Sequence, residues 1–141
     1  MAIVKALFVL VASNYAGGLR LDDAEFASRP YDAAAAYRAS KQADRMLAAA
    51  WAARQPALAV YACHPGIADS SVARGLGMAF SDAQAAAKAG AATPLLLALS
   101  PPSALAPSGA YYSDGRVARC PFAEDTAGVD GLWALVESYD A

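Results

Sequence analysis

Three separated polar groups in this sequence have the residue types needed for carbonyl reduction. Tyr37 precedes Lys41 by four residues, which places a proton donor and a cation on one face of a helix. A nearby ammonium favours the phenolate over the neutral phenol, so tyrosine becomes a usable acid and base. Ser13 follows an apolar run, and its hydroxyl could hydrogen-bond a carbonyl oxygen on which charge develops. The hydride of such a reaction has to come from a cofactor.

Short apolar runs predict the strands that would position these groups. Residues 3–12 suit a fully buried parallel strand that ends at Ser13. Residues 58–63 suit a second buried strand, followed by His64-Pro65-Gly66, where the backbone must turn. Residues 109–113 form a candidate third strand. A secretory signal is the alternative for the first run, but its β-branched and aromatic residues favour a strand.

Helix-forming segments alternate with these runs. Residues 32–54 are nearly all good helix formers, with Asp32 as the N-cap and Gln55-Pro56 as the stop. Residues 81–84 have the form of a capping box that opens a second helix, in which Pro94 predicts a kink or a break. A third helix is indicated by helical spacing of apolar and aromatic residues near the C-terminus: Leu132, Trp133, Val136 and Tyr139.

The alternation of strand and helix predicts a single α/β domain. We expect a partial Rossmann-like, doubly wound parallel sheet of about three strands, with helices on both faces. Ligands of such sheets bind at the carboxyl ends of the strands. Ser13 and the segment His64-Pro65-Gly66 should therefore meet at one edge of the sheet, with His64 holding the loop rather than acting as an acid or base.

Composition excludes several other classes of protein. Hydrophobic residues make up 57% of the 141 residues and charged residues 17%, which argues against a disordered chain. The net charge is −2 without a basic cluster, so nucleic acid is not an expected partner. Cys63 and Cys120 have no CxxC spacing and the chain has one histidine, so no metal site is expected. We expect reduced, buried thiols, a cytoplasmic location and no membrane span.

Longer motifs resemble the short-chain dehydrogenase/reductase family, and within it the branch of the retinol dehydrogenases and their relatives. Residues 10–13 (Leu-Val-Ala-Ser) are similar to that family's strand ending in the catalytic serine. Tyr37 to Lys41 matches its tyrosine-lysine motif, and His64-Pro65-Gly66 matches its third landmark. The resemblance covers nearly the whole chain. Its branch-level part comprises the long loop after Ser13 and residues 90–91, 108–112 and 132–133.

This resemblance implies an NAD(P)-dependent oxidoreductase that interconverts an alcohol and a carbonyl compound by hydride transfer. Tyr37 is implied as the general acid/base. Lys41 is implied to tune the tyrosine and to bind the nicotinamide ribose, and Ser13 to orient the carbonyl. NADP is slightly preferred over NAD as the cofactor. The implied substrate is a small hydrophobic alcohol or carbonyl compound.

The family also implies cofactor contacts from Tyr37 and Lys41 and from the turn after the second strand. Pro65, Gly66 and Ile67 would contact the nicotinamide through this turn. Ser70 would contact its carboxamide, with Ser71 as the alternative if the alignment slips by one residue.

One feature of the family is absent from the sequence. The glycine-rich phosphate loop should follow the first strand of a dinucleotide fold, and neither Gly17-Gly18 nor Gly75-x-Gly77 follows the right element. Residues 1–141 are therefore expected to be the C-terminal portion of such a domain, with the N-terminal half of the fold missing. A strand edge exposed in this way could pair with another chain, for example in a homo-oligomer.

Two other hypotheses stay open. The first is a truncated, catalytically silent fragment that acts only through association with another chain. The second is a Ser/Lys hydrolase built from Ser13 and Lys41, which would need an oxyanion hole and would give Tyr37 no role. Asp22 and Asp23 are expected to be solvated loop charges without a chemical role.

Overall fold

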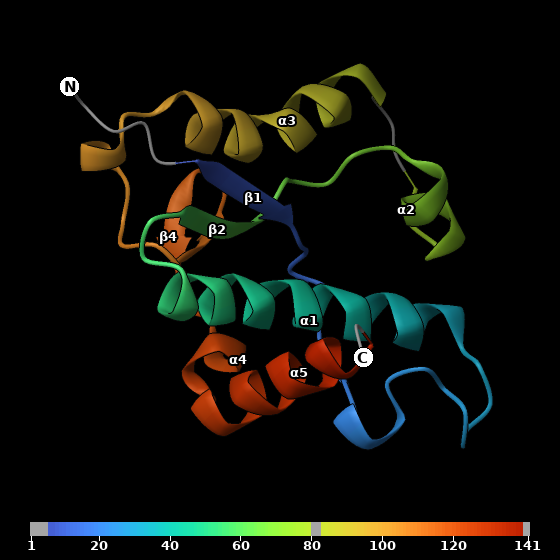
Figure 1. Cartoon of the computed structure of the whole chain (residues 1–141). Helices are drawn as coiled ribbons and strands as arrows, with labels where there is room; N and C mark the ends of the chain where they lie inside the picture. The colour runs from blue at the N-terminus through green and yellow to red at the C-terminus, as the bar shows by residue number, and fades with distance from the viewer. Residues whose placement is uncertain (1–5, 80–82, 140–141) are drawn as a thin grey trace.

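A four-stranded sheet lies at the centre of the computed structural model, which describes residues 6–79 and 83–139 (Figure 1). Its strands lie in the order β1-β2-β3-β4. The first three run parallel and the fourth runs antiparallel to β3. The α/β, Rossmann-like fold class is confirmed, and β4 is an addition to the three strands that were predicted. The strands are β1 (Leu7–Val11), β2 (Ala59–His64), β3 (Tyr111–Ser113) and β4 (Arg116–Ala118).

Strand β1 corrects one prediction, because it lies at an edge of the sheet. In residues 6–79 and 83–139 only β2 pairs with it. Leu7, Phe8 and Val11 are 38%, 53% and 47% exposed, so the expectation of a fully buried strand over 3–12 is wrong for its described part; residues 3–5 lie outside the described residues. Strand β2 has a neighbour on each side and is buried from Val60 to Cys63, as predicted.

Helices cover both faces of the sheet, as Figure 1 shows. Helix α1 (Ala33–Arg54) lies on one face, with α4 (Pro121–Glu124) and α5 (Thr126–Ser138) packed against its outer side. The N-cap prediction for α1 is confirmed, since an Asp32 carboxylate oxygen accepts a hydrogen bond of 2.7 Å from the Ala35 amide. The shorter helical segments are α2 (Ser71–Gly75), η1 (Leu21–Asp23) and η2 (Pro102–Ala104).

Helix α3 (Ala83–Leu99) covers the other face of the sheet. The sequence predicts a kink or a break at Pro94. Pro94 lies inside the helix, which continues to Leu99, so the prediction of a break is wrong. A proline removes one backbone hydrogen bond, and packing can offset that cost. Leu97 is fully buried and anchors the second half of α3 on the sheet. The predicted capping box falls partly on residues 81 and 82, outside the described residues. No helix in the described ranges is long and apolar enough to cross a bilayer.

The two faces of β2 divide the core into two layers. Val60 and Ala62 belong to the cluster that includes Ala48 of α1. Tyr61 and Cys63 alternate with them and pack with Leu97 of α3. A third cluster joins α1 to α5 and contains Met46, Ala50, Val129 and Leu132.

Burial makes a specific prediction for Cys63. Its side chain is 0% exposed, and burial raises the pKa of the thiol to about 11. Because the thiolate is the reactive species, Cys63 should be labelled by a disulfide reagent at pH 8 roughly 100-fold more slowly in the native protein than in urea. The measurement uses the Cys120→Ala variant, so that only Cys63 reports. Labelling at the rate of a free thiol under native conditions would contradict this packing.

Candidate active site

A cavity of about 700 Å³ lies at the carboxyl ends of β1 and β2. This is where open α/β sheets bind ligands, and the volume is typical of small-molecule sites. The cavity brings together every site residue that the sequence predicted: Ser13, Tyr37, Lys41, Pro65, Gly66, Ile67 and Ser70. Further lining residues are Asn14, Tyr15, His64, Val72, Leu76 and Met78.

Ser13 follows β1 and is 6% exposed. Its Oγ accepts a hydrogen bond of 3.0 Å from the Tyr15 amide. A hydroxyl has one proton to donate and two lone pairs, so this bond leaves the proton free for another acceptor. The geometry is compatible with a hydrogen bond from Ser13 to a carbonyl oxygen in the cavity.

Tyr37 and Lys41 lie one turn apart on α1. The Lys41 ammonium is 5.9 Å from the centroid of the Tyr37 ring. It donates to the Val11 carbonyl at 2.8 Å and pairs with Asp44 at 3.0 Å. An ammonium carries three N–H groups, so one of them is left for a ligand. The Tyr37 ring stacks on that of Tyr15 at 6.3 Å, and in the described part of the chain its hydroxyl has no hydrogen-bond partner.

The loop after β2 packs directly on α3. Gly66 has φ +107°, and a Cβ there would lie 2.6 Å from the Ala89 carbonyl oxygen. A Cβ at Gly90 would lie 3.0 Å from that of Ala68, so both glycines permit this close approach. The exposed Ile67 adds an apolar wall to the cavity.

Ser70 and Ser71 differ in their places in the loop. Ser70 is the N-cap of α2, and its Oγ accepts a hydrogen bond of 3.1 Å from the Ala73 amide. Its hydroxyl proton therefore remains available to a ligand. Ser70 lines the cavity, whereas Ser71 begins α2 and is not among the lining residues.

A group of polar residues behind Ser13 was missed by the sequence analysis. We call it the strand-end cluster, because its members come from the ends of β1, β2 and β3 and from α1. Tyr111 donates to Asn14 Oδ1 at 2.7 Å, and Asn14 donates to Ser113 Oγ at 3.0 Å and to His64 Nδ1 at 3.2 Å. Burial raises the pKa of the Tyr111 phenol to about 12, so it stays protonated as a donor. The cluster consists of Asn14, Arg45, His64, Tyr111 and Ser113.

One signal in the sequence could have revealed this cluster. Arg45 continues the spacing of Tyr37 and Lys41 by another four residues, which places all three on one helix face. A third polar residue on the buried face of an alanine-rich helix requires a partner. Arg45 is 7% exposed.

His64 is expected to make the stability of the protein depend on pH. Burial is the main cause that lowers its pKa below the usual 6.5; the Arg45 charge also lowers it, and Asp114 opposes the shift. The unfolded chain then binds a proton at a higher pH than the native protein does. The contribution of His64 to stability is therefore fully present above about pH 6.5 and is lost as the pH falls below that value. His64→Asn keeps an acceptor near Nδ1 but does not titrate.

Thermal unfolding between pH 7.5 and pH 5 tests this expectation. The wild type should lose melting temperature across this range, and His64→Asn should lose less. The range lies above the pKa of the carboxylates, whose titration would act at lower pH. Equal slopes for the two proteins would contradict the assignment.

The loop before α1 corrects the expectation for Asp23. Its side chain is 3% exposed, lies 3.3 Å from Arg29 Nε, and accepts a hydrogen bond of 2.9 Å from the Ser28 amide. That amide is the main cause that lowers the pKa of the Asp23 carboxyl. The loop folds back around this carboxylate, so Asp23 is a structural charge. Asp22 is exposed and pairs with Arg20 at 2.8 Å.

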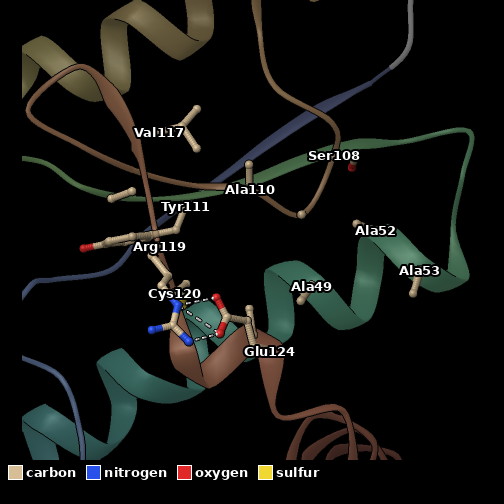
Figure 2. A pocket seen from close by; sticks show the side chains of 13 residues that line it. Ala49, Ala52, Ala53, Ser108, Ala110, Tyr111, Val117, Arg119, Cys120 and Glu124 are labelled. Carbon is tan, nitrogen blue, oxygen red and sulfur yellow. Dashed lines mark hydrogen bonds and ion pairs between the residues drawn. The ribbon is translucent and has the colours of Figure 1, made fainter.

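A second cavity, an open groove of about 470 Å³, lies between α1, β3, β4 and α4 (Figure 2). Small residues form most of its floor, among them Ala49, Ala52 and Ala110. Arg119 and Glu124 are paired with each other at 2.6 Å, so the groove offers no unpaired charge. It therefore lacks the chemical groups of the first cavity. The described residues contain no group of three or more His, Cys, Asp and Glu side chains that could hold a metal ion.

Comparisons with known proteins give two similarities, while no family model matches the chain. The human protein "Dehydrogenase/reductase SDR family member 12" is 33% identical over 102 residues, which are 70% of this chain and 32% of that protein. A crystal structure of a protein from Mycobacterium paratuberculosis superposes with a TM-score of 0.68 and 26% identity over 95% of this chain and 50% of that one. The chain thus spans about a third to a half of the length of these proteins. The first similarity supports membership of the short-chain dehydrogenase/reductase family.

Proposed function

We propose that this chain carries the catalytic side of an NAD(P)-dependent oxidoreductase that interconverts an alcohol and a carbonyl compound. The observation that carries the proposal is the meeting of Ser13, Tyr37 and Lys41 with the loop 65–70 in one cavity. These residues come from three separate segments of the chain. The similarity to a dehydrogenase/reductase supports the same chemistry.

Each of the three polar residues has a role that its contacts permit. The Tyr37 hydroxyl donates its proton to the carbonyl oxygen of the substrate and recovers it in the reverse direction. The free proton of Ser13 hydrogen-bonds the same oxygen and stabilises the charge that develops there. The Lys41 ammonium lies 5.9 Å from the centroid of the Tyr37 ring and supplies positive charge beside the acid/base.

The cavity fits the nicotinamide end of such a cofactor. Bound there, the nicotinamide would donate or accept the hydride. The third N–H of Lys41 is available to a ribose hydroxyl. Gly66, Ile67 and the Ser70 hydroxyl line the loop side of the cavity, where the carboxamide would lie. The sequence has no glycine-rich loop for the pyrophosphate, so we propose that residues 1–141 supply the C-terminal portion of a longer domain.

The finer parts of the proposal concern the branch, the substrate and the cofactor. We place the chain in the retinol dehydrogenase-like branch, with NADP slightly preferred over NAD. Apolar side chains of Ile67, Val72, Leu76 and Met78 line the cavity and suit a small hydrophobic alcohol or carbonyl compound. A cytoplasmic location is part of the proposal, and it agrees with the two free, buried cysteines.

A second candidate function has its own observation. The outer edge of β1 is unpaired within the described residues, and Phe8 is 53% exposed beside it. An open edge of this kind can pair with another strand, including that of a second copy of this chain. Under this alternative the chain is catalytically silent and acts only through association.

Calorimetric titration of the purified chain with NADPH and then NADH distinguishes the oxidoreductase from the silent fragment. Binding that is saturable and at least tenfold weaker in Lys41→Met supports the oxidoreductase, because this change removes the ammonium and keeps most of the side-chain length. Arg54→Met is the matched control, since it removes another cation of α1 outside the cavity and should bind like the wild type. A folded chain that binds neither nucleotide favours the silent fragment.

A further inference from the structure

We propose that Arg45 is a positioning residue of the candidate active site, which holds the Ser13–Asn14 segment so that the Ser13 hydroxyl faces the cavity. The role for catalysis rests on the proposed function. The role in positioning rests on the structure of the strand-end cluster and can be tested without any turnover.

The charge of Arg45 is not explained by an ordinary ion pair. The residue is 7% exposed, and in the described part of the chain no carboxylate lies within salt-bridge distance of it. Its guanidinium carbon lies 3.8 Å from the centroid of the Tyr111 ring and 5.6 Å from that of Phe122. Its Nε is buried and has no hydrogen-bond partner among residues 6–79 and 83–139. Burying a cation costs free energy unless polar or aromatic groups stabilise its charge. The oxygens that face the Arg45 guanidinium therefore have to stabilise it.

Those oxygens converge on the segment that follows β1. Arg45 Nη2 donates to the Ser13 carbonyl and to the Tyr111 hydroxyl, the latter at 2.7 Å. It also lies 3.4 Å from Asn14 Oδ1, which accepts the Tyr111 hydroxyl proton as well. One guanidinium nitrogen therefore ties Ser13 and Asn14 to β3.

The regular pairing of strands cannot hold Ser13 by itself. The Ala12 amide donates to the Cys63 carbonyl at 2.8 Å, and no later backbone hydrogen bond joins this segment to β2 among the described residues. Beyond Ala12, the hydrogen bonds from this segment to β2 and β3 in the described ranges involve side chains of the strand-end cluster. The amide of Asn14 reaches His64 Nδ1, and its side chain reaches Ser113.

The position of Arg45 on α1 gives these bonds a functional consequence. Tyr37, Lys41 and Arg45 are spaced by four residues and share one face of a single helix. The helix that carries the proposed acid/base therefore also holds the segment that carries Ser13. In this way one helix sets the relative positions of the Tyr37 and Ser13 hydroxyls, which must both reach the same carbonyl oxygen.

Amide hydrogen exchange measured by NMR tests the positioning role. The reporters are the amides of Asn14 and Tyr15, which donate to His64 Nδ1 and to Ser13 Oγ. In Arg45→Met both should exchange at least tenfold faster than in the wild type, whereas the Val129 amide of α5 should keep its rate. Arg54→Met, which removes another arginine of α1 stacked on an aromatic ring, should leave both reporters unchanged.

Two further variants keep the test decisive if Arg45→Met does not fold. Tyr111→Phe keeps the ring under Arg45 but removes the hydroxyl that links Arg45 to Asn14, so the Asn14 amide should again exchange faster. Arg45→Lys keeps the charge and should restore part of the protection. Wild-type exchange rates at Asn14 and Tyr15 in folded Arg45→Met, or in Tyr111→Phe where Arg45→Met is unfolded, would overturn the proposal.

Measurements of kcat test the catalytic role separately. If the wild type reduces a carbonyl substrate, Arg45→Met should lower kcat at least tenfold with little change in the nucleotide Kd. The same change in a Ser13→Ala background should then cost less than threefold, because Arg45 acts through Ser13. A full tenfold loss in that background would overturn the catalytic role. A wild type without turnover would favour the silent fragment, and the exchange rates would still decide the positioning role.

Discussion

Replacing Tyr37 with phenylalanine should lower the rate of carbonyl reduction by roughly 10²–10⁴-fold, the contribution usual for general acid catalysis. The variant loses the one hydroxyl in this cavity that we assign to proton transfer. It keeps the aromatic ring that stacks on Tyr15 at 6.3 Å and lies 5.9 Å from the Lys41 ammonium. The fold and the nucleotide affinity should therefore be unchanged. Initial rates with a panel of small hydrophobic ketones, together with nucleotide titrations, measure both quantities.

The design separates chemistry from structure. Tyr31→Phe removes a hydroxyl from a side chain that is 73% exposed and lies outside the cavity, so its rate should stay within twofold of the wild type. An active wild type whose Tyr37→Phe variant keeps full activity would remove Tyr37 from the mechanism. The proton would then have to come from another group of the cavity, such as the hydroxyl of Tyr15 or Ser13.

The sequence carries local signals for the residues that line the candidate site, but none for the exposure of β1. The spacing of Tyr37 and Lys41, and the turn residues Pro65 and Gly66, are local properties of the sequence. The exposure of β1 is not local, because it depends on whether another strand lies beside it. An alternating or apolar run indicates that a segment can be buried. It does not indicate which other segment of the chain lies beside it.

The fourth strand illustrates a signal that was present but weak. Asp114 and Gly115 have φ values of 51° and 71°, the left-handed conformations of a tight hairpin turn, and Asp-Gly is a preferred pair for it. The strand that follows has only three residues, too few for a periodic pattern. Asp23 shows the opposite case, since nothing in its neighbourhood in the sequence distinguishes a buried carboxylate from an exposed one before the loop closes.

Gly66 should be the glycine whose replacement by alanine costs the most stability near the site. Its φ of +107° is one that side chains rarely adopt, and a Cβ would lie 2.6 Å from the Ala89 carbonyl oxygen and 2.9 Å from its carbonyl carbon. These atoms belong to the backbone of α3 and cannot rotate away. The strained φ costs about 1–2 kcal/mol and the overpacking about 1–3 kcal/mol, so we expect a loss of about 3 kcal/mol in the free energy of unfolding.

Gly18→Ala separates these two costs, because Gly18 has φ +76° with no atom within 4 Å of the added Cβ. It should lose only the conformational part, about 1 kcal/mol, in urea unfolding measured on both variants. Similar losses for the two variants would mean that the loop does not rest on α3 as described. If the larger loss at Gly66 is found, nucleotide binding should weaken with it, because the same contact holds Ile67 and Ser70 at the cavity. The wall of the site is then set by how closely the loop approaches α3, which explains why a glycine is needed where no side chain takes part in the chemistry.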